Sequence, residues 1–214
     1  MKSLEGNPIT DPMSRLPYPG VSIQDAHYVS DIRAVQEQPC WSGVWKSHDL
    51  AVSATGKVIY VFRSPADVLA SYLHLHRLQK YAGWNTATGR NVLDCYLDEM
   101  IRHWQTAVKI RENTPDRIFI TSYESLHREP ALSIQRMVSF LKTSALSVER
   151  CEQIVTECQF EKMARAEGKS PNEERFFRRG RPGGGKETFT LLQRGYICLR
   201  THSLHNKLKE FANP

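Results

Sequence analysis

The sequence predicts an α/β fold in which a parallel central sheet is flanked by helices. Two continuous runs of β-branched and aromatic residues, Lys57–Phe62 and Arg117–Tyr123, have the composition of strands buried in a parallel sheet. A helical pattern of apolar residues follows each run, so strands and helices alternate as in βαβ units. With 214 residues, 40% of them hydrophobic, the chain is long enough to bury one core.

The first elements follow from local composition. Residues 1–40 are rich in proline and turn formers without a sustained period, so we expect irregular structure packed on a domain formed by residues 41–214. A short strand is expected at residues 44–47, before the strand at 57–62. A helix should then begin with Ser64 as N-cap and Pro65 in the first position, and Asp67 would complete a capping-box-like pattern.

The remaining elements are read from helical spacing. Residues 92–111 predict a helix with an apolar face, residues 117–123 a strand, and residues 130–141 and 148–164 two further helices. From residue 168 an irregular basic tail is expected to end in a short helix at 204–211. The residues expected to face inward are Leu93, Leu97, Met100, Ile101, Trp104 and Val108 in the helix at 92–111, and Leu132, Met137, Val138 and Leu141 in the helix at 130–141.

Charge and composition limit the classes of function. Lys and Arg number 29 and Asp and Glu 23, a net charge of +6, which favours an anionic partner: nucleic acid, an anionic membrane or a phosphorylated small molecule. No apolar run approaches the length of a membrane span, and residues 1–6 lack the apolar region of a secretory signal, so we expect a soluble, cytoplasmic protein. The five scattered cysteines include no C-x-x-C pair, which predicts reduced thiols and no metal site.

Three groups of residues could carry chemistry. Arg63 lies at the end of the clearest strand and just before a helix, where anions bind in open α/β sheets, and Ser71 lies two turns into that helix. Structural roles, an ion pair for Arg63 and simple packing for Ser71, are the alternative. Lys46 and His48 lie two residues apart at a strand end, where a histidine can accept a proton and a lysine can stabilise developing negative charge; two surface residues are the alternative.

The third group is the glycine- and arginine-rich segment at residues 176–186. Residues 180–186 nearly spell a phosphate-binding G-x-x-x-x-G-K-[ST] loop, but Glu187 replaces the hydroxyl residue and the required strand–loop–helix context is missing. A segment that folds over a polyanion fits better, since backbone amides and guanidinium groups both suit phosphate. A solvated tail with some affinity for nucleic acid is the alternative.

Together these segments resemble the cytosolic-type sulfotransferases, which use 3′-phosphoadenylyl sulfate (PAPS). The segment 57–72 closely resembles the family's strand–Arg-x-Pro-x-Asp–helix–Ser-Tyr pattern. Four others, one before it and three after it, complete a set of five segments that keep the family's order from about residue 44 to residue 190. They are Lys46-Ser47-His48 for Lys-Thr-His, Tyr123-Glu124 for Tyr-Glu, Phe160-Glu161-Lys162-Met163 for Phe-Glu-x-Met, and the segment 178–190 for Arg-Lys-Gly-x-x-Gly-x-x-Lys-x-x-Phe-Thr.

The resemblance implies a P-loop-NTPase-like sulfotransferase fold and a role for each matched residue. The protein would transfer a sulfonate from PAPS to a hydroxyl or amine of a small acceptor, without a metal. His48 would be the general base, with Lys46 near the sulfonate. The donor would be bound by Arg63, Ser71, Tyr123, Phe160, Arg178, Arg179 and Gly180.

The departures from the family pattern leave alternatives open. The family's 5′-phosphosulfate loop, Pro-Lys-Ser-Gly-Thr-Thr-Trp, is not found in residues 1–47, so the chain is expected to be an N-terminal truncation or a degenerate relative. Gly185 replaces a Trp of the cofactor lid, and Gly195 replaces the Glu that ends a dimerisation signature, so the oligomeric state stays open. The rival functions are a non-catalytic relative that binds the nucleotide and a basic nucleic-acid-binding module.

Overall fold

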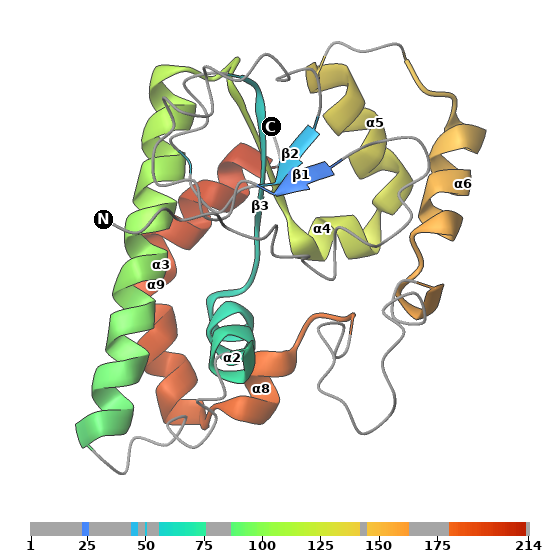
Figure 1. Cartoon of the computed structure of the whole chain (residues 1–214). Coiled ribbons are helices and arrows are strands. Elements are labelled where there is room, and N and C mark those ends of the chain that lie inside the picture. Colours follow the sequence, from blue (N-terminus) through green and yellow to red (C-terminus); the bar gives the residue numbers. More distant parts are fainter. Residues whose placement is uncertain are drawn as a thin grey trace, which may run out of the picture. The chain divides into compact units, whose positions relative to one another are not determined.

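The computed structural model describes residues 23–25, 44–46, 50, 56–75, 87–141, 145–162 and 180–212. The chain divides into two compact units, one formed by residues 1–55 with 158–178 and the other by residues 56–157 with 179–214. The predicted boundary between residues 40 and 41 falls outside the described residues. The elements, labelled in Figure 1 except for β4, are β1 (Ile23–Asp25), β2 (Val44–Lys46), β3 (Val58–Phe62), α2 (Pro65–Leu75), α3 (Ala87–Asn113), β4 (Ile118–Ser122), α4 (Tyr123–Arg128), α5 (Pro130–Leu141), α6 (Val148–Glu157), α8 (Gly184–Thr188) and α9 (Leu191–Ala212).

The first unit contains a parallel pair of strands. β1 pairs with β2 in the register that places Ile23 opposite Val44 and Asp25 opposite Lys46. The strand predicted at residues 44–47 is confirmed as β2. The expectation that residues 1–40 are irregular is wrong for β1, because this three-residue strand has no apolar run of its own and is defined by its hydrogen bonds to a distant segment.

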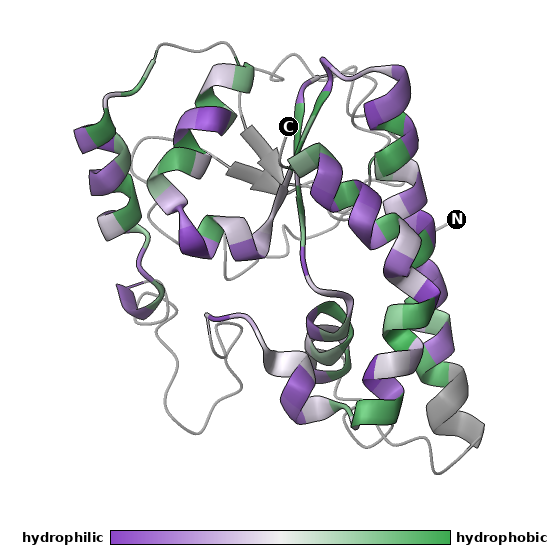
Figure 2. Cartoon of the chain, turned by 180° about the vertical axis from the view of Figure 1, so that it is seen from behind, coloured by the Kyte–Doolittle hydropathy of each residue, from purple (hydrophilic) through white to green (hydrophobic). Residues whose placement is uncertain are grey.

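The second unit is built around β3 and β4, which pair in parallel from Val58 opposite Ile118 to Phe62 opposite Ser122. Both strands were predicted, and the connection between them runs through α2 and α3. Figure 2 shows that these strands are largely hydrophobic, whereas α3 and α9 carry hydrophobic and hydrophilic residues along their length. The predicted α/β architecture with a parallel sheet is therefore confirmed.

The core of this unit lies between the strands and the long helices α3 and α9, which run side by side (Figure 1). Of the α3 residues expected to face inward, all are buried except Ile101, which is half-buried. The ring of Phe62 at the end of β3 meets Trp104 of α3 edge to face, with centroids 6.5 Å apart. None of the helices in the described part of the chain is both long and apolar enough to cross a membrane.

Helix α5 has the predicted bounds, but its inward face was only partly predicted: Met137, Val138 and Leu141 are half-buried, whereas Leu132 is not. Leu132 is 40% exposed, and Ser133 is the residue that is buried. The Ser133 hydroxyl lies 2.8 Å from the carbonyl oxygen of Glu129 and 3.5 Å from that of Ser125 on α4. The apolar pattern was misleading because a small residue with local hydrogen bonds faces the neighbouring helix instead.

Three helix lengths also differ from the prediction. Helix α3 spans Ala87–Asn113 and so extends beyond the predicted 92–111 at both ends. Helix α6 ends at Glu157, before the predicted residue 164, although residues 160–162 are again helical. The helix predicted at 204–211 is the long helix α9, which starts at Leu191. A capping box marks that start: the Thr190 amide donates to Gln193 Oε1 at 2.9 Å, and the Gln193 amide donates to Thr190 Oγ1 at 3.3 Å.

Candidate functional site

Two of the predicted binding residues meet at the carboxyl ends of β3 and β4. Phe62 and Ser122, the last residues of these strands, are paired, so Arg63 and Tyr123 leave the sheet at the same edge. The guanidinium carbon of Arg63 lies 4.3 Å from the centroid of the Tyr123 ring, a cation–π contact. Residues 60 positions apart in sequence therefore form one surface at the edge where ligands bind in open α/β sheets.

The turn from β3 into α2 is held by a second residue of the β4 end. The Ser64 carbonyl accepts the amides of Asp67 and Val68, both at 3.0 Å, so α2 begins at Pro65 as predicted. The Ser64 amide donates to Glu124 Oε1 at 2.9 Å. The predicted capping-box role of Asp67 is wrong, because Glu124 accepts the amide that Asp67 would have accepted.

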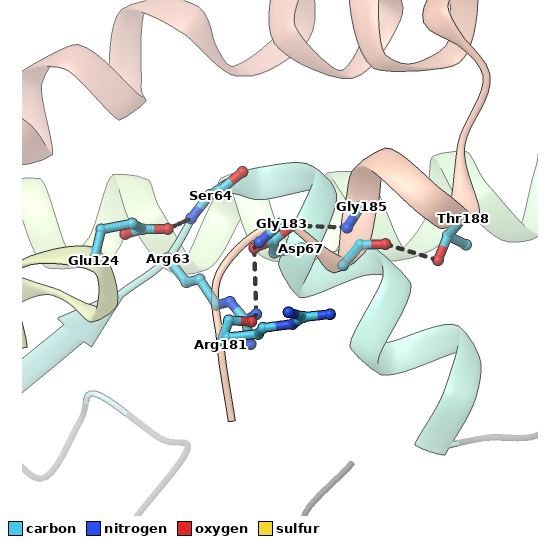
Figure 3. A network of polar contacts seen from close by, with 9 residues as sticks. Arg63, Ser64, Asp67, Glu124, Arg181, Gly183, Gly185 and Thr188 are labelled. Atoms are coloured by element: carbon cyan, nitrogen blue, oxygen red, sulfur yellow. Dashed lines mark hydrogen bonds and ion pairs between the residues drawn. The ribbon is translucent and has the colours of Figure 1, made fainter. Parts of the chain in front are cut away.

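The Asp67 carboxylate instead binds the glycine-rich segment that precedes and begins α8. Asp67 is only 4% exposed. Its Oδ2 accepts the Gly183 amide and its Oδ1 accepts the Gly185 amide, both at 2.7 Å, and Arg63 Nη2 lies 3.2 Å from Oδ2 (Figure 3). A carboxylate with three donors in this geometry has the short, charge-assisted bonds that hold two chain segments firmly together.

Backbone conformation and close packing explain why three positions of this segment are occupied by glycine. Gly180 and Gly183 have φ angles of 60° and 105°, in the left-handed region that favours glycine. A Cβ on Gly185 would lie 2.6 Å from the carbonyl carbon of Ala66, so only glycine lets α8 approach α2 this closely. We call residues Gly180–Gly185 the glycine turn.

Arg63 lies between this turn and the sheet edge. Its Nη2 donates to the carbonyl oxygen of Arg181 at 3.1 Å, in addition to its bond to Asp67. Its Nε is buried and has no hydrogen-bond partner within the part of the chain that the structure describes. Leaving a buried donor without an acceptor costs about 1 to 3 kcal/mol, so this position suits an anionic acceptor.

The electrostatics of Tyr123 are consistent with a sheltered site. Burial is the largest effect and raises the pKa of the Tyr123 hydroxyl; the positive charge of Arg63 acts in the opposite direction. The phenol is therefore neutral at physiological pH, and its ring presents an unchanged π face to the Arg63 guanidinium. Among the described residues, no group of His, Cys, Asp and Glu side chains could hold a metal ion.

The other predicted site residues are only partly described. Gly180 begins the glycine turn, and Ser71 is exposed on α2, two turns after Arg63. Phe160 is half-buried and belongs to the other unit, as does Lys46, of which the backbone in β2 is described. His48, Arg178 and Arg179 lie outside the described residues.

Sequence reasoning missed the residues that support Arg63. Asp67 was interpreted as a helix cap and as part of the family's Arg-x-Pro-x-Asp pattern, Glu124 as part of its Tyr-Glu pattern, Gly183 as part of its glycine-rich motif and Gly185 as a replacement of its Trp. No supporting role for Arg63 was assigned to any of them. One signal was available: an acidic residue one turn into a helix that leaves a buried strand has a carboxylate free to bind a second segment. The identity of that segment is not encoded locally.

Most of the chain is similar to proteins of one known family. A family model described as sulfotransferase domain matches residues 29–209. Cytosolic sulfotransferase 12 of Arabidopsis thaliana is 27% identical over 157 residues, which cover 64% of this chain and 46% of the relative. The amine sulfotransferase of Oryctolagus cuniculus is 30% identical over 160 residues, which cover 64% of this chain and 50% of the relative. The chain thus spans about half the length of the curated relatives it matches.

Two solved structures share the fold. A mouse sulfotransferase, SULT7A1, complexed with PAP aligns with a TM-score of 0.64 at 19% identity, covering 94% of this chain and 82% of the other. A retinol dehydratase in complex with retinol and PAP aligns with a TM-score of 0.60 at 19% identity, covering 80% of this chain and 56% of the other. At such identities the likeness shows the fold, and it agrees with the α/β architecture expected from the motifs.

Proposed function

The chain belongs to the sulfotransferase domain family, and from this premise we propose that it binds PAPS and transfers its sulfonate to a hydroxyl or amine of a small acceptor. The observation that carries the proposal is the arrangement around Arg63. Its guanidinium lies over Tyr123 and against the glycine turn, with a buried Nε that lacks an acceptor in the described part of the chain. A phosphate group of the nucleotide has the charge and the acceptor atoms that this position lacks.

The remaining residues of the nucleotide site are assigned by the family motif. Arg63, Ser71, Arg178, Arg179 and Gly180 would bind the 3′-phosphate. Tyr123 would contact the adenine and Phe160 would stack near it. Two similar solved structures contain PAP, the nucleotide left after sulfonate transfer, which supports a nucleotide of this class.

The chemistry of transfer is assigned to Lys46 and His48. The bound donor supplies an activated sulfonate. The His48 imidazole would accept the proton of the acceptor hydroxyl or amine, and the Lys46 ammonium would stabilise negative charge near the sulfonate. Positioning and charge stabilisation would supply most of the rate enhancement.

The names of the relatives support proposals for the acceptor of this protein and for its cellular location. Similar proteins are named for amine and flavonol substrates, and solved neighbours hold retinol or androsterone, so a small organic acceptor is proposed for this chain. Several relatives are named as cytosolic sulfotransferases, and the same location is proposed here.

A binding-only function is the second candidate, because residues 1–47 contain no match to the family's 5′-phosphosulfate loop. Removing one donor that stabilises developing charge costs a factor of about 10² to 10³ in rate. A chain that binds nucleotide in a 1:1 complex but does not transfer sulfonate to any small phenol or amine would support this candidate over the enzyme.

The first experiment is calorimetric titration of the full chain with adenosine 3′,5′-bisphosphate. We expect saturable 1:1 binding that weakens by a factor of about 10 to 100 in Arg63→Ala, because a charge-assisted contact is lost. Arg150→Ala is the matched control, since Arg150 forms an exposed ion pair with Glu157 on α6. The proposal would be contradicted if the wild-type protein did not bind the nucleotide, or if Arg63→Ala bound it with the same affinity as the wild-type protein. Tight, salt-sensitive RNA binding in its place would favour the nucleic-acid alternative.

A further inference from the structure

We propose that Asp67 is the positioning residue of the phosphate site. Its carboxylate, on α2, binds both the glycine turn and the Arg63 guanidinium, and so fixes their positions relative to each other. The inference rests on the proposed nucleotide-binding function and adds a residue that the family motif leaves without a role in this chain. Asp67 does not contact the nucleotide in this proposal. It acts through the backbone amides of Gly183 and Gly185 and through Arg63.

The first argument is the burial and coordination of the carboxylate. At 4% exposure, Asp67 is nearly removed from water, and an unpaired carboxylate there would be costly. Each oxygen instead accepts a glycine amide at 2.7 Å, and Oδ2 also accepts from Arg63 Nη2 at 3.2 Å. The two bonds from glycine amides link Asp67 to residues that lie 116 and 118 positions later in the sequence.

The second argument is the geometry of the glycine turn. Gly185 lies so close to Ala66 that a side chain could not be accommodated, and this approach is what brings the Gly185 amide within reach of Asp67. In Figure 3, Gly185 at the start of α8 and Gly183 just before the helix lie beside Asp67. The glycine at the family's Trp position therefore has a steric reason in this chain.

The third argument is the position of Arg63. Its Nη2 bonds to Asp67 and to the Arg181 carbonyl, which orients the guanidinium across the Tyr123 ring. With Nη2 engaged, the buried Nε remains for an acceptor. Loss of the Asp67 contacts would free both the turn and the guanidinium, so that ordering them would oppose nucleotide binding.

Asp67→Asn tests this role with almost no change in volume. An asparagine has one acceptor oxygen and one NH₂ group, so at least one of the three donors around residue 67 would face another donor. The two probes are adenosine 3′,5′-bisphosphate and adenosine 5′-monophosphate, which differ by the 3′-phosphate. We expect the ratio of their affinities to fall by a factor of about ten or more in Asp67→Asn, while the affinity for the monophosphate stays within about threefold.

A second variant and two controls complete the design. Gly185→Ala keeps the carboxylate but pushes α8 away from α2, and it should lower the same ratio even if Asp67→Asn does not fold. Asp98→Asn, which removes the carboxylate of an ion pair with Arg200 between α3 and α9, should leave the ratio unchanged. Gly195→Ala, where an added Cβ meets no atom of the described residues within 4 Å, should do the same.

A spectroscopic readout separates positioning from general destabilisation. In wild-type protein, the amide protons of Gly183 and Gly185 should resonate downfield and exchange slowly, because both bind a carboxylate. In Asp67→Asn at least one of them should move upfield and exchange faster, without comparable changes in α9.

The outcomes are distinguishable. Wild-type protein that binds both nucleotides equally would overturn the proposed function and this inference with it. Wild-type protein that prefers the bisphosphate, together with an unchanged preference in Asp67→Asn, would overturn this inference alone. A parallel loss of both affinities in the folded variants would also overturn it, because it would indicate a purely structural role.

Discussion

Gly185→Ala tests how tightly the glycine turn is packed on α2. The added Cβ would lie 2.6 Å from both the carbonyl carbon and Cβ of Ala66, against an ordinary contact of 3.4 Å or more. Helix α8 would have to move away from α2 by about 0.8 Å. Such a movement takes the Gly185 amide from 2.7 Å to about 3.5 Å from Asp67 Oδ1, the limit of a hydrogen bond.

The expected loss of stability follows from three contributions. Overpacking costs about 1 to 3 kcal/mol. The weakened bond to a buried carboxylate costs about 1.5 to 3 kcal/mol. Replacing a helical glycine by alanine returns about 0.5 to 1 kcal/mol. We therefore expect the free energy of unfolding to fall by about 1.5 to 5.5 kcal/mol.

Urea unfolding followed by circular dichroism measures this change. With an m value of about 2 kcal/mol/M, the midpoint should fall by about 1 to 3 M without a change in m. Gly195→Ala is the control, because no atom of the described residues lies within 4 Å of its Cβ position in α9, and it should raise the midpoint slightly. Equal midpoints for the two alanine variants would refute the steric argument.

Two further predictions concern α9. Burial is the main cause that lowers the pKa of His205 to about 4, and the ring stacks on Trp104 with centroids 5.4 Å apart. The unfolded chain therefore binds a proton more readily between pH 6.5 and 4, so unfolding free energy should fall by about 1 kcal/mol as pH drops through this window, after allowance for partial exposure. His205→Gln should remove this part of the slope in pH-dependent urea titrations, and an unchanged slope would contradict the assignment. Thr190→Ala should cost about 1 kcal/mol by removing the cap of α9, measured by thermal unfolding; an unchanged Tm would show that the Gln193 bonds do not stabilise the helix.

The strands and helix starts near the site were predictable because they depend on neighbours in sequence. The run ending at Phe62 has the composition of a buried strand, and Pro65 suits only the first turn of a helix, so Arg63 had to occupy the turn between them. The register of β3 with β4, which places Phe62 opposite Ser122, was not predicted, because it depends on hydrogen bonds between segments that are distant in sequence. Leu132 shows the limit of this reasoning, since spacing alone does not reveal which face of a helix a neighbour will cover.

The sequence by itself determined that an arginine, a tyrosine and a glycine turn were available for an anion. It did not determine how they are held. Asp67 could have bound the Ser64 amide one turn away, and the local pattern favoured that bond. Only the folded chain brings the Gly183 and Gly185 amides to the carboxylate and gives the Ser64 amide to Glu124, because these contacts depend on packing between segments that are distant in sequence.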